Sequence, residues 1–161
     1  SDYGRWMLLA LGFCMIGDLF LMPDNERSFL IGLVAFLLGH LLFAVAFLQL
    51  PLNATGVLYT IAPAFFLLVF VRSWLLPNVG ADMKIPVIAY VLVITSMLFA
   101  AGATLGQPAA TLIIVGAWGF AISDLAVSRQ QFVQPSRWNG LWGTPLYFAA
   151  QMVLAGSVGV Q

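Results

Sequence analysis

Long, uninterrupted apolar runs are the feature that most constrains the fold of this chain. A helix that spans a lipid bilayer needs about 20 mostly apolar residues. The runs are continuous rather than alternating, and each is far longer than a membrane barrel strand of about ten residues. The sequence therefore predicts an all-α fold, a polytopic transmembrane helix bundle. Its six predicted spans are Trp6–Met22, Phe29–Leu50, Gly56–Leu76, Ile85–Ala103, Pro108–Val127 and Leu141–Val160.

Short breaks separate the six runs, and each break has the chemistry of a turn or a helix end. Proline, asparagine and glycine recur in residues 23–25, 50–53, 77–80, 106–108 and 134–136. No connection is long enough to hold a separate soluble domain. Residues 1–161 are therefore predicted to form a single integral membrane domain, with any activity inside or at the edge of the bilayer.

Charge is scarce, which excludes several classes of function. Only 7% of the residues are charged, against roughly a quarter in soluble domains. Six basic residues balance six acidic ones, so no basic surface predicts nucleic-acid binding. The single cysteine, Cys14, excludes an internal disulfide and argues against a structural cysteine metal site.

The loop charges predict an orientation for a multi-pass protein. If the spans alternate, one face collects every basic residue except Arg5, and the positive-inside tendency makes that face cytoplasmic. Both ends of this chain are then outside. The residues on the cytoplasmic face are Arg27, Arg72, Lys84, Arg129 and Arg137.

Two aspartates lie within the predicted spans, where an Asp costs about 2.5–3.5 kcal/mol at the bilayer centre. Asp18 is near the cytoplasmic end of the first span, and Asp124 is near the cytoplasmic end of the fifth. At 1.5 Å per residue both lie roughly 5 Å below the same interface. Equal depth allows the two carboxyl groups to meet.

Other polar residues are predicted to reach the same depth. His40 lies inside the second span, and Tyr147 and Gln151 share one face of the sixth because they are four residues apart. Ser123 precedes Asp124 and is expected to cap, to bond its own helix or to face a partner. We predict a pocket that opens toward the cytoplasm.

Each of these residues also has a structural interpretation. Asp18 could extend to the nearby interface or pair with Arg27, and Asp124 could pair with Arg129, slightly more than one turn later. His40 could be a hydrogen-bonded core histidine, and Tyr147 and Gln151 could only join helices. Basic residues near the interface set topology by default. Contact with a phosphate, predicted above all for Arg129 and Arg137, is the functional alternative.

Two carboxyl groups in one apolar pocket favour acid–base chemistry. Burial favours the protonated form of a carboxyl, and a second carboxylate favours it further, so one group holds a proton while the other stays ionised. A Ser123 nucleophile lacks the surrounding glycine motif. A catalytic metal on His40, Asp18 and Asp124 lacks any paired-histidine signature, so no metal and no cofactor is predicted.

Four sequence blocks resemble the YhhN family, which includes the TMEM86 lysoplasmalogenases. They are "GDLFLM" (17–22), "FLIGLVAFLLGHLLFAVAF" (29–47), "GAWGFAISDLAVSRQQF" (116–132) and "TPLYFAAQMVLAGS" (144–157). The order and spacing match, and each block holds one of the polar residues described above. The resemblance covers nearly the whole chain.

The resemblance implies an eight-helix pattern, of which this chain lacks the first two helices and their Lys-Pro motif. Together with a start at Ser1 rather than at a methionine, this predicts that the natural protein begins earlier. Phe43 is a second departure, because the family pattern often has an aromatic hydroxyl after the histidine.

The resemblance further implies hydrolysis of the vinyl ether bond of lysoplasmalogens. The products are a fatty aldehyde and glycerophosphoethanolamine or glycerophosphocholine. The two motif aspartates of the family correspond to Asp18 and Asp124. The expected partners are the lysophospholipid substrate and membrane lipids. The alternatives are a small transporter coupled to protons or cations, and a membrane protein that binds lipid without catalysis.

Overall fold

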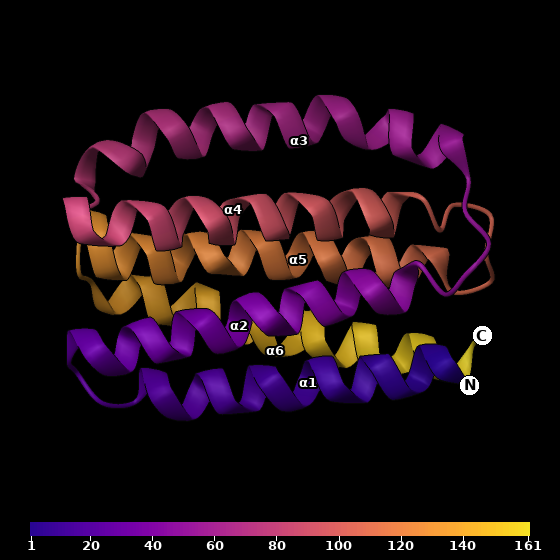
Figure 1. The fold of residues 1–161 in the computed structure, drawn as a ribbon, viewed down its shortest axis with the longest axis horizontal. Helices are drawn as coiled ribbons and strands as arrows, with labels where there is room; N and C mark the ends of the chain where they lie inside the picture. Colours follow the sequence, from indigo (N-terminus) through magenta and orange to yellow (C-terminus); the bar gives the residue numbers. More distant parts are fainter.

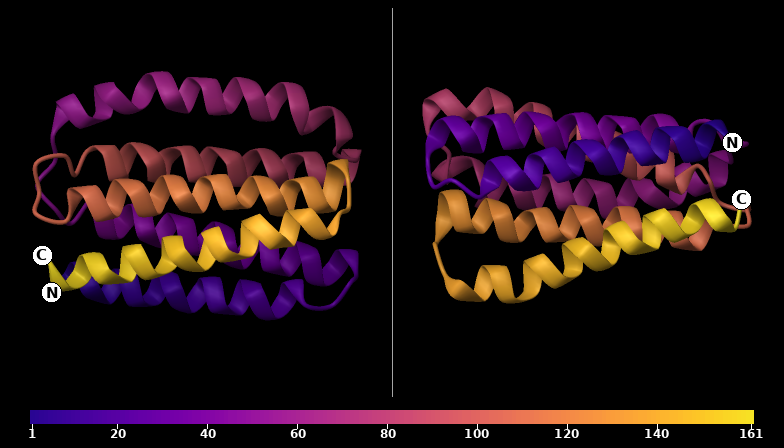
Figure 2. Two further views of the ribbon diagram at one scale, coloured as in Figure 1. Left: turned by 180° about the vertical axis from the view of Figure 1, so that it is seen from behind. Right: turned by 90° about the horizontal axis from the view of Figure 1, so that it is seen from below.

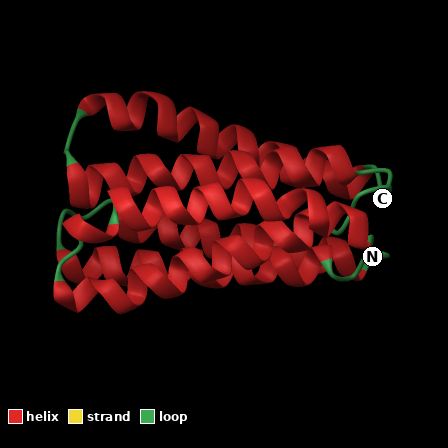
Figure 3. Cartoon of the chain, turned by 90° about the horizontal axis from the view of Figure 1, so that it is seen from above, coloured by secondary structure: helices red, strands yellow, loops and turns green.

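Six long helices and no strand make up the computed structural model, which describes residues 1–161. The chain runs back and forth along one long axis, and the loops lie only at the two ends (Figures 1 and 3). The predicted all-α bundle is confirmed, and each helix begins and ends within four residues of its predicted bounds. The helices are α1 (Asp2–Leu21), α2 (Glu26–Phe47), α3 (Ala54–Trp74), α4 (Ala81–Gly102), α5 (Ala110–Ser128) and α6 (Arg137–Gly156). Short helical segments follow α3, α5 and α6, namely η1 (Leu76–Asn78), η2 (Arg129–Val133) and η3 (Ser157–Gly159).

Polar side chains in the breaks start four of the helices. Asn25 accepts a hydrogen bond from the Ser28 N–H at the start of α2, and Asn53 accepts one from the Thr55 N–H at the start of α3. Ser1 and Ser136 cap α1 and α6 in the same way. Such caps satisfy N–H groups that have no partner within the helix.

Five helices are long and apolar enough to cross a membrane, so the prediction of six spans holds for α1 to α5. The exception is α6, which has 20 residues but carries Arg137, Asn139 and Gln151. These polar groups lower its mean hydropathy. Together the five apolar helices make the chain an integral membrane protein.

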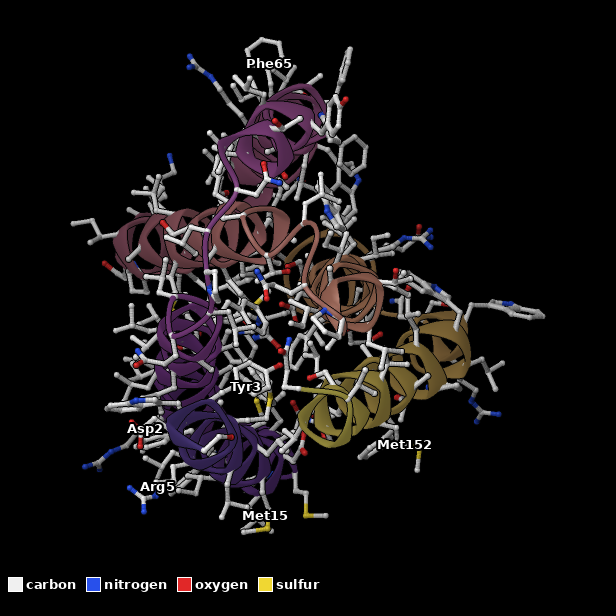
Figure 4. The ribbon with its side chains drawn as sticks, turned by 90° about the vertical axis from the view of Figure 1, so that its right-hand side faces the viewer. Asp2, Tyr3, Arg5, Met15, Phe65 and Met152 are labelled. Atoms are coloured by element: carbon white, nitrogen blue, oxygen red, sulfur yellow. The ribbon has the colours of Figure 1, made fainter.

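The helices are buried to different degrees. In α2, 50% of the most apolar stretch of 18 residues is buried inside the bundle. In the corresponding stretch of α3, which lies on the outside, only 22% is buried (Figure 1). An end-on view shows Tyr3 pointing into the bundle, whereas Met15, Phe65 and Met152 point outward (Figure 4). The outward apolar side chains suit contact with lipid.

The two ends of the bundle differ in packing. We call one the closed end, which holds both termini and residues 48–53 and 103–109. Here α3 and α4 touch through glycines, because a Cβ on Gly56 would lie 1.9 Å from the carbonyl oxygen of Gly102. Tyr3 on α1 hydrogen-bonds Ser157 of η3 across the same end. Backbone contact of this kind is typical of helix pairs in membranes.

We call the other the open end, which holds residues 22–25, 75–80 and 129–136. Here α6 lies beside α5, and along its length it crosses the bundle toward α1 (Figure 2). The first turns of α6 therefore diverge from α1. This oblique course leaves the space in which the polar side chains lie.

Candidate active site

A cavity of about 1150 Å³ occupies the open end, between the α1–α2 pair and the α5–α6 pair. Asp18 and Asp124 both line it. Its inner wall includes Leu33, Phe36 and Val91, whereas its mouth is polar. The lining residues at the mouth include Asp24, Asn25, Glu26, Gln130, Ser136 and Arg137. The cavity can therefore hold an amphiphilic molecule, with a polar group at the mouth and an apolar chain inside.

Asp18 is oriented by α6. It is half-buried, and its Oδ2 accepts a hydrogen bond of 2.9 Å from the Tyr147 hydroxyl. Gln151, one turn further along α6, donates to the same hydroxyl oxygen. The spacing of four residues places both side chains on one helix face. The result is a chain of two hydrogen bonds that ends on the Asp18 carboxyl group.

Asp124 is oriented by α2 and α4. Its Oδ2 accepts a hydrogen bond of 3.1 Å from the Tyr90 hydroxyl and lies 3.3 Å from Nε2 of His40. Asp124 and Tyr90 also border a second, small cavity of about 30 Å³ between α3, α4 and α5. The Asp124 side chain is 14% exposed, so it is far more enclosed than a surface carboxylate.

His40 is completely buried. Its Nδ1 donates a hydrogen bond of 2.6 Å to the carbonyl oxygen of Phe36, one turn earlier on α2. Its ring packs edge-on against Phe120 and Tyr90, with centroid distances of 4.5 and 5.3 Å. Nε2 faces Asp124 but has no aligned hydrogen bond, and an unpaired buried polar atom costs about 1–3 kcal/mol.

The pairings with arginine that were structural alternatives for the two aspartates do not occur. The structure contains one ion pair between fixed charges, Arg5 with Asp2, and a close approach of His40 to Asp124, so neither Arg27 nor Arg129 pairs with an intramembrane aspartate. The hydroxyl of Ser123 donates to the Phe120 carbonyl oxygen, so it bonds its own helix. Ser123 nevertheless lines the cavity.

The structure separates the two arginines that were predicted to bind phosphate. Arg137 lies at the mouth of the cavity. Arg129 instead donates to Asn139 and Gln134, at 3.4 and 3.1 Å, and is not part of the cavity wall. Its guanidinium group holds the start of α6 against η2, which is a structural role.

Two further predicted residues lie behind the cavity wall rather than in it. His40 reaches the cavity only through Asp124, and Gln151 only through Tyr147. The sequence analysis missed Tyr90, whose hydroxyl binds Asp124. Phe43 is fully buried and has no hydroxyl to offer, so Tyr90 on α4 is the aromatic hydroxyl beside this histidine. No group of three His, Cys, Asp or Glu side chains comes together as metal ligands.

The profile of the YhhN family matches residues 1–158. This chain belongs to the YhhN family. The bovine lysoplasmalogenase TMEM86A is 31% identical to it over 156 residues, which cover 92% of this chain and 63% of the relative. The human lysoplasmalogenase TMEM86B is 32% identical over 158 residues, or 96% of this chain and 63% of the relative.

A bacterial relative gives a similar picture. The lysoplasmalogenase of Mycobacterium tuberculosis is 32% identical over 134 residues, or 80% of this YhhN chain and 51% of the relative. The chain thus spans between about half and two thirds of the length of these relatives. No solved structure matches it.

Proposed function

We propose that this chain carries the active site of a membrane lysoplasmalogenase, which hydrolyses the vinyl ether bond of alkenyl lysophospholipids. One observation carries the proposal: aspartates from two distant helices line a single cavity at one end of an apolar bundle. The names of the relatives support it, because the bovine, human and mycobacterial proteins are all lysoplasmalogenases.

The cavity suits a lysophospholipid in size and in polarity. Its volume of about 1150 Å³ slightly exceeds the roughly 300–1,000 Å³ typical of small-ligand pockets, as a long chain requires. The alkenyl chain would lie along Leu33 and Phe36, and the phosphate would meet Arg137 at the mouth. A guanidinium group binds phosphate through charge-assisted hydrogen bonds. Arg129 is left out of this proposal because it is not part of the cavity wall and donates to Asn139 and Gln134 instead.

The chemistry needs an acid and a carboxylate. Protonation of the β-carbon of a vinyl ether gives an oxocarbenium ion, which water captures to form a hemiacetal. The hemiacetal then collapses to an aldehyde and an alcohol, here the glycerophospholipid. One aspartate would donate the proton, while the other would stabilise the cation and take a proton from water. General acid–base assistance contributes about a hundredfold to ten-thousandfold, and electrostatic stabilisation adds to it.

The basic residues of the chain indicate which side of the membrane the cavity mouth would face. The five basic residues of the cytoplasmic face predicted above lie at or near the open end, which is the left-hand end of the bundle in Figure 1. The mouth of the cavity would then face the cytoplasm. Most of the cavity-lining residues lie in the open-end loops or in the open-end halves of their helices, which favours a closed-ended pocket over a transport pathway.

Incubation of the purified protein with two matched lipids tests the proposal. One is an alkenyl lysophospholipid and the other is its acyl counterpart with the same head group, and free aldehyde and free fatty acid are followed by mass spectrometry. We expect aldehyde from the alkenyl lipid and no fatty acid from the acyl lipid. Absence of aldehyde while the alkenyl lipid demonstrably binds would replace the enzyme proposal with lipid binding or transport.

A further inference from the structure

Both ring nitrogens of His40, the only histidine in the chain, have a fixed neighbour. Nδ1 lies 2.6 Å from the Phe36 carbonyl oxygen, which can only accept a hydrogen bond, so Nδ1 carries a hydrogen. In a neutral imidazole the other nitrogen then presents a bare lone pair. That lone pair would lie on an atom 3.3 Å from Oδ2 of Asp124.

A neutral His40 and an ionised Asp124 would therefore place two acceptor atoms against each other. The repulsion would be strong, because Nε2 is completely buried and has no other hydrogen-bond partner. One proton between the two atoms removes it. The pair is then either imidazolium with carboxylate or imidazole with carboxylic acid, and both forms hold the same number of protons.

Building on the proposed function, we infer that His40 and Asp124 share one proton and that this pair is the proton donor to the vinyl ether. Asp124 lines the cavity and touches the substrate, so it is the catalytic residue. His40 lies behind it and is a positioning residue that keeps the proton in place. Asp18 is the carboxylate that accepts a proton from water.

The different surroundings of the two aspartates support this assignment. Asp124 has an imidazole beside it and two neighbours on one oxygen. Asp18 pairs with no cation, since its one side-chain partner is the Tyr147 hydroxyl, which donates to it.

Apart from Asp18, no neighbour of the pair can replace this proton donor. The titratable groups that face it are Tyr90 from α4, Tyr147 from α6, and Cys14 and Asp18 from α1. Phenols and thiols keep their protons near neutral pH and are weak acids. The third helix contributes only apolar side chains beside Asp124, namely Leu67, Val71 and Leu75.

The proton balance closes over one turnover. The shared proton moves from Asp124 to the β-carbon, whose π electrons form the new C–H bond and leave an oxocarbenium ion. Asp18 takes one proton from the attacking water. It gives that proton to the glycerol oxygen as the C–O bond of the hemiacetal breaks, and the hemiacetal hydroxyl proton returns to Asp124. Water is consumed, and both carboxyl groups return to their starting forms.

Nitrogen NMR tests the shared proton directly, because labelling histidine with nitrogen-15 gives signals from one residue alone. In detergent-solubilised wild type at the working pH, we expect a protonated Nδ1 and an Nε2 signal shifted by a shared or bound proton. In Asp124→Asn, Nε2 should become a bare nitrogen. A bare Nδ1, or an identical Nε2 signal in both proteins, would overturn the inference.

The pH profile of kcat/KM tests the role of that proton in turnover. In wild type, activity should fall as rising pH removes the shared proton. In His40→Gln no imidazole helps to hold the proton, so this alkaline limb should move to lower pH. Tyr90→Phe removes a hydrogen bond to the same oxygen but keeps the imidazole, so its limb should stay in place.

If His40→Gln lowers kcat but the alkaline limb of its pH profile does not move, the role of the shared proton would be overturned. His40 would then be a packing residue. If His40→Gln does not fold, the NMR comparison decides alone. The NMR readout needs no turnover. Wild-type protein that shows the shared proton but releases no aldehyde would therefore reject the proposed function and not the shared proton.

Discussion

The closed end and the open end of this bundle are made from the same six helices, yet the first is tightly packed and the second encloses a cavity. At the closed end, glycine and alanine bring backbones into contact, as at Gly56 and Gly102. At the open end, α6 diverges from α1, and a cavity of about 1150 Å³ replaces the contact. Polar groups at the closed end bond neighbouring backbone or one another, whereas Asp18 and Asp124 face a cavity. Rigid packing at one end thus supports an accessible site at the other.

The largest expected effect is on turnover at the open end. Asp124→Asn and Asp18→Asn should each lower kcat by at least about a hundredfold to ten-thousandfold, because each removes an acid or a base. Melting temperature should remain close to that of wild type, since asparagine keeps the size and a hydrogen-bonding oxygen. Aldehyde release and thermal unfolding are measured on the same preparations. Wild-type activity in either variant would remove that aspartate from the mechanism.

The closed end should respond in the opposite way. Gly56→Ala forces a methyl group against the Gly102 carbonyl oxygen and should cost about 1–3 kcal/mol of unfolding free energy. Turnover per folded molecule should not change. Gly12→Ala is the matched control, because nothing lies within 4 Å of the added methyl group, and it should be neutral or slightly stabilising. Unchanged stability with lost turnover in Gly56→Ala would erase the contrast between the ends.

The two tyrosine hydroxyls should give intermediate effects. Tyr147→Phe removes the hydrogen bond to Asp18, and Tyr90→Phe removes the one to Asp124. A hydrogen bond to a charged group is worth about 1.5–3 kcal/mol, so kcat should fall roughly tenfold to a hundredfold in each. Tyr59→Phe is the control, since Tyr59 is 72% exposed on the surface of α3. An equal loss of activity in Tyr59→Phe would indicate a general effect of hydroxyl removal.

The smallest effect is expected at the mouth of the cavity. Arg137→Gln should raise KM for the lysophospholipid several-fold and leave kcat nearly unchanged. The loss of binding free energy should be about 1 kcal/mol, because the charge is exposed. Arg72→Gln removes the same charge near the same end of the bundle but outside the cavity, and its KM should match wild type. Equal KM shifts in both variants would indicate a general attraction to lipid instead of a phosphate contact.

Much of this architecture could be predicted from the sequence, because length, polarity and chain order carry it. Runs of about 20 apolar residues give the helices, and the depth of Asp18 and Asp124 along theirs predicts that they can meet. The spacing of Tyr147 and Gln151 predicts that they act together, and the structure joins them through one hydrogen bond.

The rotation of each helix could not be predicted in the same way. A membrane helix such as α4 is apolar all round, so no hydrophobic face shows which side turns inward. This is why Tyr90 was missed although its hydroxyl binds Asp124. The hydrogen bonds of Arg129 to Asn139 and Gln134 could not be predicted either. They form because the turn between η2 and α6 brings these residues together, and no local sequence motif indicates that turn.

Turnover of an alkenyl lysophospholipid in deuterium oxide tests the central claim most directly, that aspartates at the open end protonate a vinyl ether. The fatty aldehyde is trapped by reduction as it forms, and unlabelled aldehyde incubated alike corrects for exchange. We predict that wild type releases aldehyde with one deuterium on the carbon next to the aldehyde carbon. Asp124→Asn should release almost none of this product, because its turnover is lost. Aldehyde without that deuterium, or its undiminished release by Asp124→Asn, would contradict the claim.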